Sequence, residues 1–185
     1  MSKTAGSKKF NPQKLTSDLL SLLSTRQKDV LIKRFGLKNG RRKTLEAIGD
    51  EYGITRERVR QIENDAKAAI LKSEQVKGLD PLFQAFADHL GAYGGARAEH
   101  VLFSKDVKHF FPADVDTDIA SAHLYFLLSL GAHFIRHSET NEFHPTWTVK
   151  NARVENTKMA LQQLIRRLED KKELVTPAAV ALRAI

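Results

Sequence analysis

The 185-residue sequence contains no cysteine and no long uninterrupted run of apolar residues. The first absence excludes disulfide bonds and thiolate metal ligands, and it suits a reducing cytoplasm. The second leaves no segment near the roughly 20 apolar residues that a membrane-spanning helix needs. The amino-terminal residues are basic, but no apolar stretch with a small-residue cleavage site follows them, so we expect no secretory signal. The 42% of hydrophobic residues is normal for a soluble fold with a core.

The sequence also lacks the common motifs of enzymes and nucleotide-binding proteins. It has no Walker loop, no GxSxG elbow, no GxGxxG fingerprint and no HExxH pair. Residues 91–95 are rich in glycine, but they follow a helical pattern rather than a strand and so lack the context of a phosphate-binding loop. We therefore predict that the protein is not an enzyme and needs no cofactor.

Seven histidines, all beyond residue 88, raise the question of a metal site. The closest set is His133, His137 and His144, but no cysteine or suitably spaced carboxylate completes a ligand set. We favour ordinary surface or hairpin histidines and predict no metal. A nearby acidic group precedes a predicted helix, and we expect it to cap that helix rather than hold a cation; its members are Asp114, Asp116 and Asp118.

Positive charge is concentrated in the first part of the chain. The formal net charge is +8, yet residues 1–77 hold 18 Lys and Arg against 9 Asp and Glu, whereas residues 78–185 hold 12 against 13. Clustered cations favour a polyanionic partner, because phosphate contacts release counterions. The alternative on charge alone is a surplus that keeps the protein in solution.

The same change of charge coincides with Gly78 and Pro81, where we place a domain boundary. Residues 1–15 are expected to form a flexible basic tail, residues 16–77 and 78–150 two domains, and residues 151–185 C-terminal helices. Because the chain ends abruptly in apolar residues, we expect the natural protein or its fold to continue beyond Ile185.

Residues 16–77 show the caps and apolar spacing of four helices. The expected caps are Thr16, Ser24 or Thr25, Thr44 and Thr55, and the expected buried stripe of the fourth helix is Val59, Ile62, Ala66 and Ile70. The third and fourth helices are joined by a tight turn at Gly53, and the fourth has a polar, basic outer face. This arrangement predicts a helix-turn-helix whose second helix enters the major groove of DNA.

Residues 78–150 are expected to form three helices and a β-hairpin. The patterns place helices at 82–91, 104–111 and 117–130, and strands at 133–136 and 143–149. Three helices followed by a hairpin indicate a winged helix. The predicted fold class is thus mainly α, with a helix-turn-helix domain followed by a winged-helix-like α+β domain.

Three segments carry a specific resemblance. Residues 22–37 (LLSTRQKDVLIKRFGL), 44–49 (TLEAIG) and 52–63 (YGITRERVRQIE) resemble region 4 of the sigma-70 family of bacterial transcription initiation factors. The TRERVRQIE run is far more specific than a generic helix-turn-helix pattern, and the resemblance extends over residues 16–73. It implies a helix that reads the promoter minus-35 element.

The resemblance implies base contacts by Arg56, Glu57 and Gln61. Their chemistry agrees, because Arg suits guanine, Glu accepts from cytosine N4 and Gln suits adenine. It also implies phosphate contacts by Thr44, Leu45, Thr55, Arg58 and Arg60, to which the basic loop adds Arg41 and Arg42.

The family's region 4 also binds the β flap of RNA polymerase with its first two helices. Leucines of the chain's own first helices could serve that contact, although we favour core packing for each; they are Leu19, Leu22 and Leu23. Residues 82–150 are similar, by pattern, to the HARE type of winged helix found in the delta subunit of some RNA polymerases. A near-neutral charge suits that part to protein contacts.

These features predict a cytoplasmic, nucleoid-associated bacterial protein that binds promoter-like double-stranded DNA as a transcription regulator or sigma factor-like protein, and that contacts RNA polymerase. Because the aromatic, DNA-melting region of complete sigma factors does not precede the motif, we do not expect this chain alone to open a promoter. The alternative is a protein-interaction module that binds the polymerase flap or another protein without useful DNA affinity.

Overall fold

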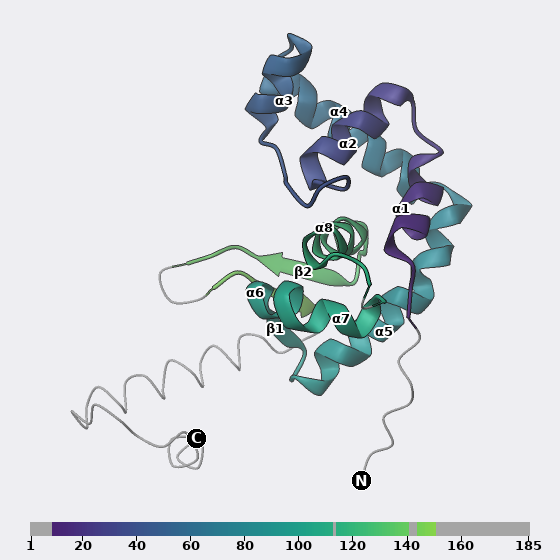
Figure 1. Cartoon of the computed structure of the whole chain (residues 1–185), viewed down its shortest axis with the longest axis vertical. Helices are drawn as coiled ribbons and strands as arrows, with labels where there is room; N and C mark the ends of the chain where they lie inside the picture. The colour runs from purple at the N-terminus through teal and green to yellow at the C-terminus, as the bar shows by residue number, and fades with distance from the viewer. Residues whose placement is uncertain (1–8, 113, 141–143, 151–185) are drawn as a thin grey trace, which may run out of the picture.

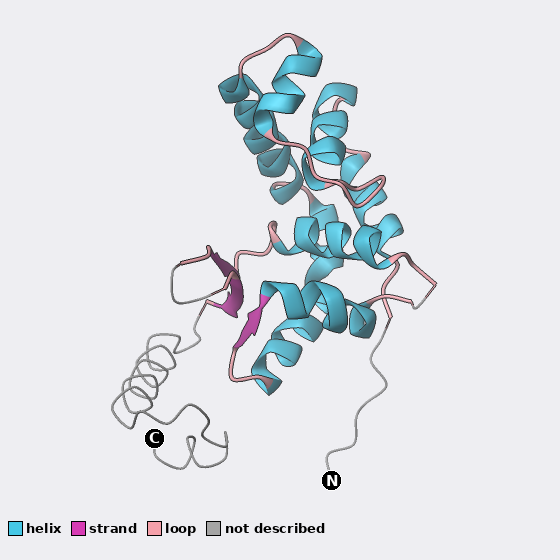
Figure 2. Ribbon diagram, turned by 60° about the vertical axis from the view of Figure 1, so that its left-hand side comes forward, coloured by secondary structure: helices cyan, strands magenta, loops and turns pink. Residues whose placement is uncertain are grey.

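A computed structural model describes residues 9–112, 114–140 and 144–150; the C-terminal helices predicted at 151–185 and the first part of the predicted tail lie outside this range. The fold is mainly helical, as predicted, with a small sheet at one side (Figures 1 and 2). None of the described helices is long and apolar enough to cross a membrane. The elements are α1 (Pro12–Leu20), α2 (Thr25–Phe35), α3 (Leu45–Tyr52), α4 (Arg56–Leu71), η1 (Glu74–Leu79), α5 (Asp80–Ala92), β1 (Ala96–Ala98), α6 (Glu99–Val101), η2 (Leu102–Asp106), α7 (Val107–Phe110), α8 (Thr117–Leu128), β2 (Phe134–His137) and β3 (Thr146–Val149).

The predicted caps of α2, α3 and α4 are confirmed. Ser24 and Gln27 form a reciprocal capping box at the start of α2, and Thr44 and Thr55 each accept a hydrogen bond from the backbone N–H three residues on. Gly53 ends α3 with φ of 61°, a left-handed conformation that glycine adopts without strain. These local signals set the turn that separates the two helices of the helix-turn-helix.

Helix α1 begins earlier than predicted. Its cap is Asn11, whose side chain accepts from the backbone N–H of Lys14, so the expected cap at Thr16 is wrong and residues 12–15 are helical rather than tail. Thr16 is instead buried, and its hydroxyl lies 2.7 Å from Nδ1 of His123 on α8. The segment before α1 is also fixed, because the Phe10 N–H donates to the carbonyl of Phe110 over 2.8 Å.

The second part follows the order helix, strand, helix, helix, strand, strand. Strand β3 lies between β1 and β2 and pairs antiparallel with both. The predicted helices and hairpin are present, and Asp116 caps α8 as expected. The middle helical segment starts at Glu99 rather than 104 and contains a π turn at η2. Strand β1 was not predicted, because three residues are too few to show an alternating pattern.

The two parts share one hydrophobic core. A small separate cluster holds the helix-turn-helix together and contains Val30, Ile48, Val59 and Ile62. The main cluster runs from α1 and α2 through η1 to α5 and α8. At its centre the rings of Phe35 on α2 and Phe126 on α8 meet at 5.1 Å in an edge-to-face arrangement. The expected boundary at 77/78 thus falls within η1, where apolar packing is continuous.

Candidate nucleic-acid interface

Helix α4 presents the predicted base-contacting residues on one exposed face. Its buried stripe is the predicted one, with Val59, Ile62, Ala66 and Ile70 at most 8% exposed. Arg56, Glu57 and Gln61 are all exposed on the amino-terminal half of the helix. Helix α3 and the amino-terminal end of α4 lie at the end of the molecule away from the sheet (Figure 1).

Each of these three side chains is held by a neighbouring group of opposite or complementary chemistry. The Arg56 guanidinium lies 3.3 Å from a carboxylate oxygen of Glu46, and Arg60 pairs with Glu57 at 2.7 Å. The hydrogen bond from Arg60 holds the pKa of Glu57 below its usual value, so this carboxylate is a ready acceptor. Exposed pairs of this kind contribute little free energy, so DNA can replace them at low cost.

The amino termini of α3 and α4 supply the predicted phosphate-contacting positions. The Thr44 hydroxyl accepts from the Ala47 N–H at 3.1 Å, and the Thr55 hydroxyl accepts from the Arg58 N–H at 3.2 Å. Each threonine therefore satisfies one backbone donor of the first turn, and at α3 the Glu46 carboxylate accepts from its own backbone N–H. Such helix ends attract anions through free N–H groups and the helix dipole.

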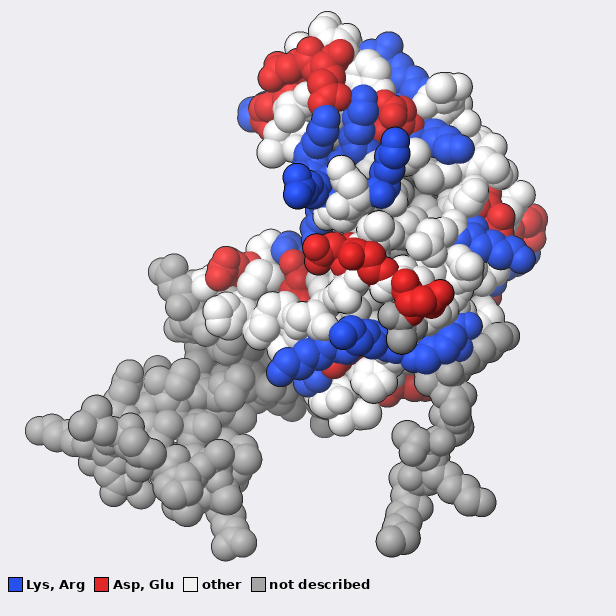
Figure 3. All heavy atoms as spheres, viewed as in Figure 1, with Lys and Arg blue, Asp and Glu red and all other residues white. Residues whose placement is uncertain are grey.

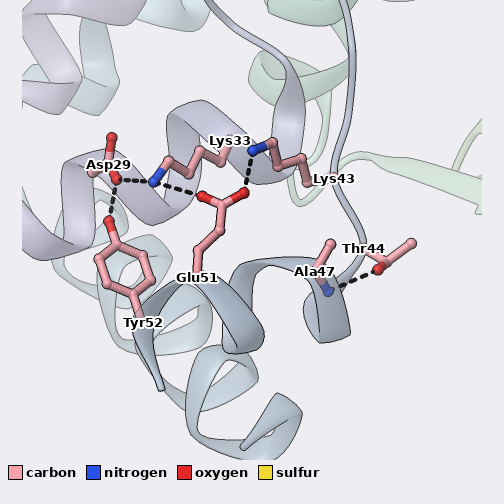
Figure 4. Close-up of polar contacts among 7 residues, drawn as sticks. All are labelled: Asp29, Lys33, Lys43, Thr44, Ala47, Glu51 and Tyr52. Carbon is pink, nitrogen blue, oxygen red and sulfur yellow. Dashed lines mark hydrogen bonds and ion pairs between the residues drawn. The ribbon is translucent and has the colours of Figure 1, made fainter. Parts of the chain in front are cut away.

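A polar network that the sequence did not indicate fixes the last turn of α3 against α2 and the end of the basic loop (Figure 4). Lys33 on α2 bridges Asp29 at 2.8 Å and Glu51 at 2.9 Å, and Lys43 also pairs with Glu51. Burial alone would raise the pKa of Asp29, but hydrogen bonds from Lys33 and Tyr52 hold it below its usual value. The network ties the basic loop and α3 to α2, next to Thr44.

The basic loop between α2 and α3 separates its two predicted phosphate-contacting arginines. Arg41 and Arg42 are both exposed, but the Arg42 guanidinium also lies 3.9 Å from the ring centroid of Tyr125 on α8. Arg42 thus contacts the second part while it remains accessible to solvent. Figure 3 shows a group of Lys and Arg side chains directly above a row of acidic side chains, with a further row of Lys and Arg below that row and acidic side chains also at the top of the molecule.

The leucines considered for a polymerase contact have different environments. Leu19 is buried, as expected for core, and Leu23 packs against the core. Leu22 is 39% exposed, so the expectation that it belongs to the core is wrong; the chain turns away from α1 just before it. Beside Leu22 lies an open recess of about 430 Å³ whose apolar lining comes from Leu20, Leu23 and Ile32.

The histidines predicted as surface or hairpin groups do not gather around a common point. His133 is exposed, His137 contacts the Thr148 hydroxyl at 3.0 Å, and His144 lies 3.7 Å from Glu139. Over residues 9–112, 114–140 and 144–150, no group of three His, Asp or Glu side chains could hold a metal ion. Asp116 accepts from two backbone N–H groups of α8, which accounts for it as a cap.

Comparison with known proteins agrees with this geometry. Residues 19–70 match the family model for sigma-70, region 4. Over 48 residues the chain is 58% identical to the RNA polymerase sigma factor SigA1 of Synechococcus elongatus. The aligned segment makes up 26% of this chain but only 12% of the length of that protein. The segment that matches contains the complete helix-turn-helix, its caps and its exposed basic face. Residues 19–70 therefore form a helix-turn-helix domain of the sigma-70 region 4 family.

Proposed function

We propose that the protein binds DNA in a sequence-specific manner at promoter elements of the minus-35 type and thereby acts in transcription, as a regulator or a sigma factor-like protein. The observation that carries the proposal is the exposed face of α4 on which Arg56, Glu57 and Gln61 stand together. The relative named above is an RNA polymerase sigma factor, which supports a role of this kind. Such work takes place at the nucleoid of a bacterial cytoplasm.

The chemistry of the face suits direct readout of base edges. An arginine at the start of α4 pairs with O6 and N7 of guanine, Glu57 accepts from N4 of cytosine, and Gln61 serves adenine. Both Thr44 and Thr55 then lie at helix ends that meet the flanking phosphates. The base contacts of α4 are thus combined with phosphate contacts that do not depend on sequence, as is typical of helices that bind in the major groove.

A second candidate function rests on the α1–α2 face. Leu22 is exposed, and its neighbours Ser21 and Leu23 line an open recess whose lining is partly apolar. An exposed apolar group next to a concave surface favours a protein partner. By analogy with the family, this face would bind the β flap of RNA polymerase. It can operate together with DNA binding or, if α4 has lost useful affinity for DNA, in place of it.

Fluorescence anisotropy tests the main proposal. The full chain is titrated against a labelled duplex that carries a TTGACA-type hexamer and against a scrambled duplex, each at low and at near-physiological salt. We expect tighter binding to the hexamer by a margin that survives added salt, because base contacts depend on salt less than phosphate contacts do. Equal binding that fades with salt would contradict readout of this hexamer, and no binding at all would favour the protein-interaction function.

A further inference from the structure

Helices α2, α4 and α8 meet at a small recess that includes only Arg42 of the predicted contact residues. Its volume is about 110 Å³, which is the space of roughly three to four water molecules at about 30 Å³ each. It is therefore too small for a nucleoside but suited to a compact ion. The residues that line it are Arg34, Phe35, Arg42, Glu63, Lys67, Tyr125 and Ser129.

The charges around the recess do not balance. Among the described residues, the only carboxylate in its lining is that of Glu63, which pairs with Lys67 at 2.7 Å through one oxygen and with Arg34 at 3.2 Å through the other. Arg42 adds a third cation, so the lining carries two positive charges in excess. The recess is concave and its walls are partly apolar. Water therefore screens the attraction between these charges and an anion less than it would on an open surface.

Arg42 keeps its hydrogen-bond donors available. The central carbon of its guanidinium lies 3.9 Å from the centroid of the Tyr125 ring. Such a cation–π contact acts on the positive charge and does not use the N–H groups as donors to an acceptor atom. Within the described part of the chain, no carboxylate forms an ion pair with Arg42. The contact therefore positions a cation without consuming its hydrogen-bonding capacity.

We propose that this recess binds a phosphate group, held by Arg34, Arg42 and Lys67. Arginine suits the planar, bidentate recognition of phosphate oxygens, and lysine contributes a compact charge. The ligand class includes inorganic phosphate, a phosphate monoester and a phosphate of the DNA backbone, which share this chemistry. Because Tyr125 lies on α8 and Ser129 caps the end of that helix, a bound phosphate links the region 4 domain to the second part. The site does not depend on base readout by α4.

Thermal unfolding of the full chain tests the site. Inorganic phosphate is compared with chloride at equal ionic strength and pH 8, where phosphate is mainly dianionic. Saturating phosphate is expected to raise the Tm by about 2–4 °C, since a ligand that binds only the folded state stabilises it. Arg42→Gln and Lys67→Gln should abolish the rise, whereas Lys105→Gln and Lys108→Gln, which remove exposed lysines of η2 and α7, should keep it. An equal rise in all four variants would overturn the proposal.

Glu63→Gln separates a binding site from a purely structural ion pair. The substitution removes the carboxylate that competes with an incoming anion for Arg34 and Lys67. We expect a lower Tm in chloride but a larger rise with phosphate than in the wild type. If Glu63→Gln lowers the Tm and phosphate produces no rise, the recess is only structural and the proposal fails.

A competition experiment identifies the source of the phosphate. Anisotropy with duplex DNA is repeated with saturating phosphate at constant ionic strength. If phosphate weakens DNA binding by the wild type but not by Arg42→Gln, a backbone phosphate occupies the recess. If the affinity for DNA is unchanged while phosphate still raises the Tm, the ligand is a free phosphate or phosphate monoester. Either outcome supports the site, and both differ from failure of base readout, which leaves the phosphate response intact.

Discussion

Gly40 lies so close to Asp118 that a Cβ atom on the glycine would fall 2.7 Å from the Cβ of the aspartate. The pair joins the basic loop of the region 4 domain to the first turn of α8. The loop's conformation is therefore set by the second part of the molecule as well as by its own sequence. Because this loop also carries Arg41 and Arg42, the second part influences where phosphate-contacting side chains stand.

Substitution of Gly40 is expected to weaken the contact between the two parts. Gly40→Ala meets both a left-handed φ of 73° and the steric conflict with Asp118, whereas Gly94→Ala meets a similar φ of 74° with nothing within 4 Å. Gly94→Ala should lower the free energy of unfolding by about 1 kcal/mol, and Gly40→Ala should lower it by about 1–3 kcal/mol more. Chemical denaturation measures both values. Equal losses of unfolding free energy in the two variants would show that the close contact between Gly40 and Asp118 of α8 does not affect stability.

The contact between α1 and α8 is expected to make stability depend on pH. Burial lowers the pKa of His123, and the backbone carbonyl of Leu37 only partly opposes this effect. Between the lowered pKa and the ordinary value near 6.5, the unfolded state binds more protons than the folded state. The free energy of unfolding therefore rises with pH through this window, and stability is lost as the pH falls below about 6.5.

The measurement is the Tm of the wild type and of His123→Gln at pH 5.5 and pH 7.5. Both proteins contain the same other histidines, so the difference between the two slopes isolates His123. The wild type should lose more stability at the lower pH than the variant does. Parallel slopes would mean that His123 becomes charged without cost, contrary to its burial beside Thr16.

Arg41 and Arg42 are expected to respond differently to removal. Arg41→Ala should reduce the slope of log affinity against log salt by about 1 and leave the Tm unchanged, because its side chain is exposed. Arg42→Ala should also lower the Tm by about 1–4 °C, because it removes the contact with Tyr125. Paired melting curves and salt titrations check this, and equal Tm values for the two variants would contradict the difference in environment.

The helix-turn-helix could be predicted from the sequence because the signals that set its helices lie close together in the chain. Ser24, Thr44 and Thr55 cap helices through bonds to residues three positions away, and Gly53 ends α3 by its own conformation. The exposed face of α4 follows from helical periodicity. Spacing along one helix therefore sufficed to place Arg56, Glu57 and Gln61 together.

The contacts between the two parts were not readable, because they join residues far apart in the chain. Thr16 has the residue type of a cap but bonds to His123 instead, and Asn11 takes the capping role. Arg42 was predicted from its charge alone, and its contact with Tyr125 on α8 was not predicted. The periodic pattern of apolar residues along a sequence does not show which distant residues pair. The shared core and the recess are therefore seen only in the three-dimensional structure.

The central claim is that α4 reads base edges, and a binding profile over single base-pair changes in the hexamer tests it most directly. The wild type is compared with Arg56→Ala and Gln61→Ala, and with Lys108→Ala as a control outside the region 4 domain. Each α4 variant should lose about 1–3 kcal/mol of discrimination at one position while retaining its affinity for scrambled DNA. If both variants keep the wild-type profile, α4 does not read the sequence.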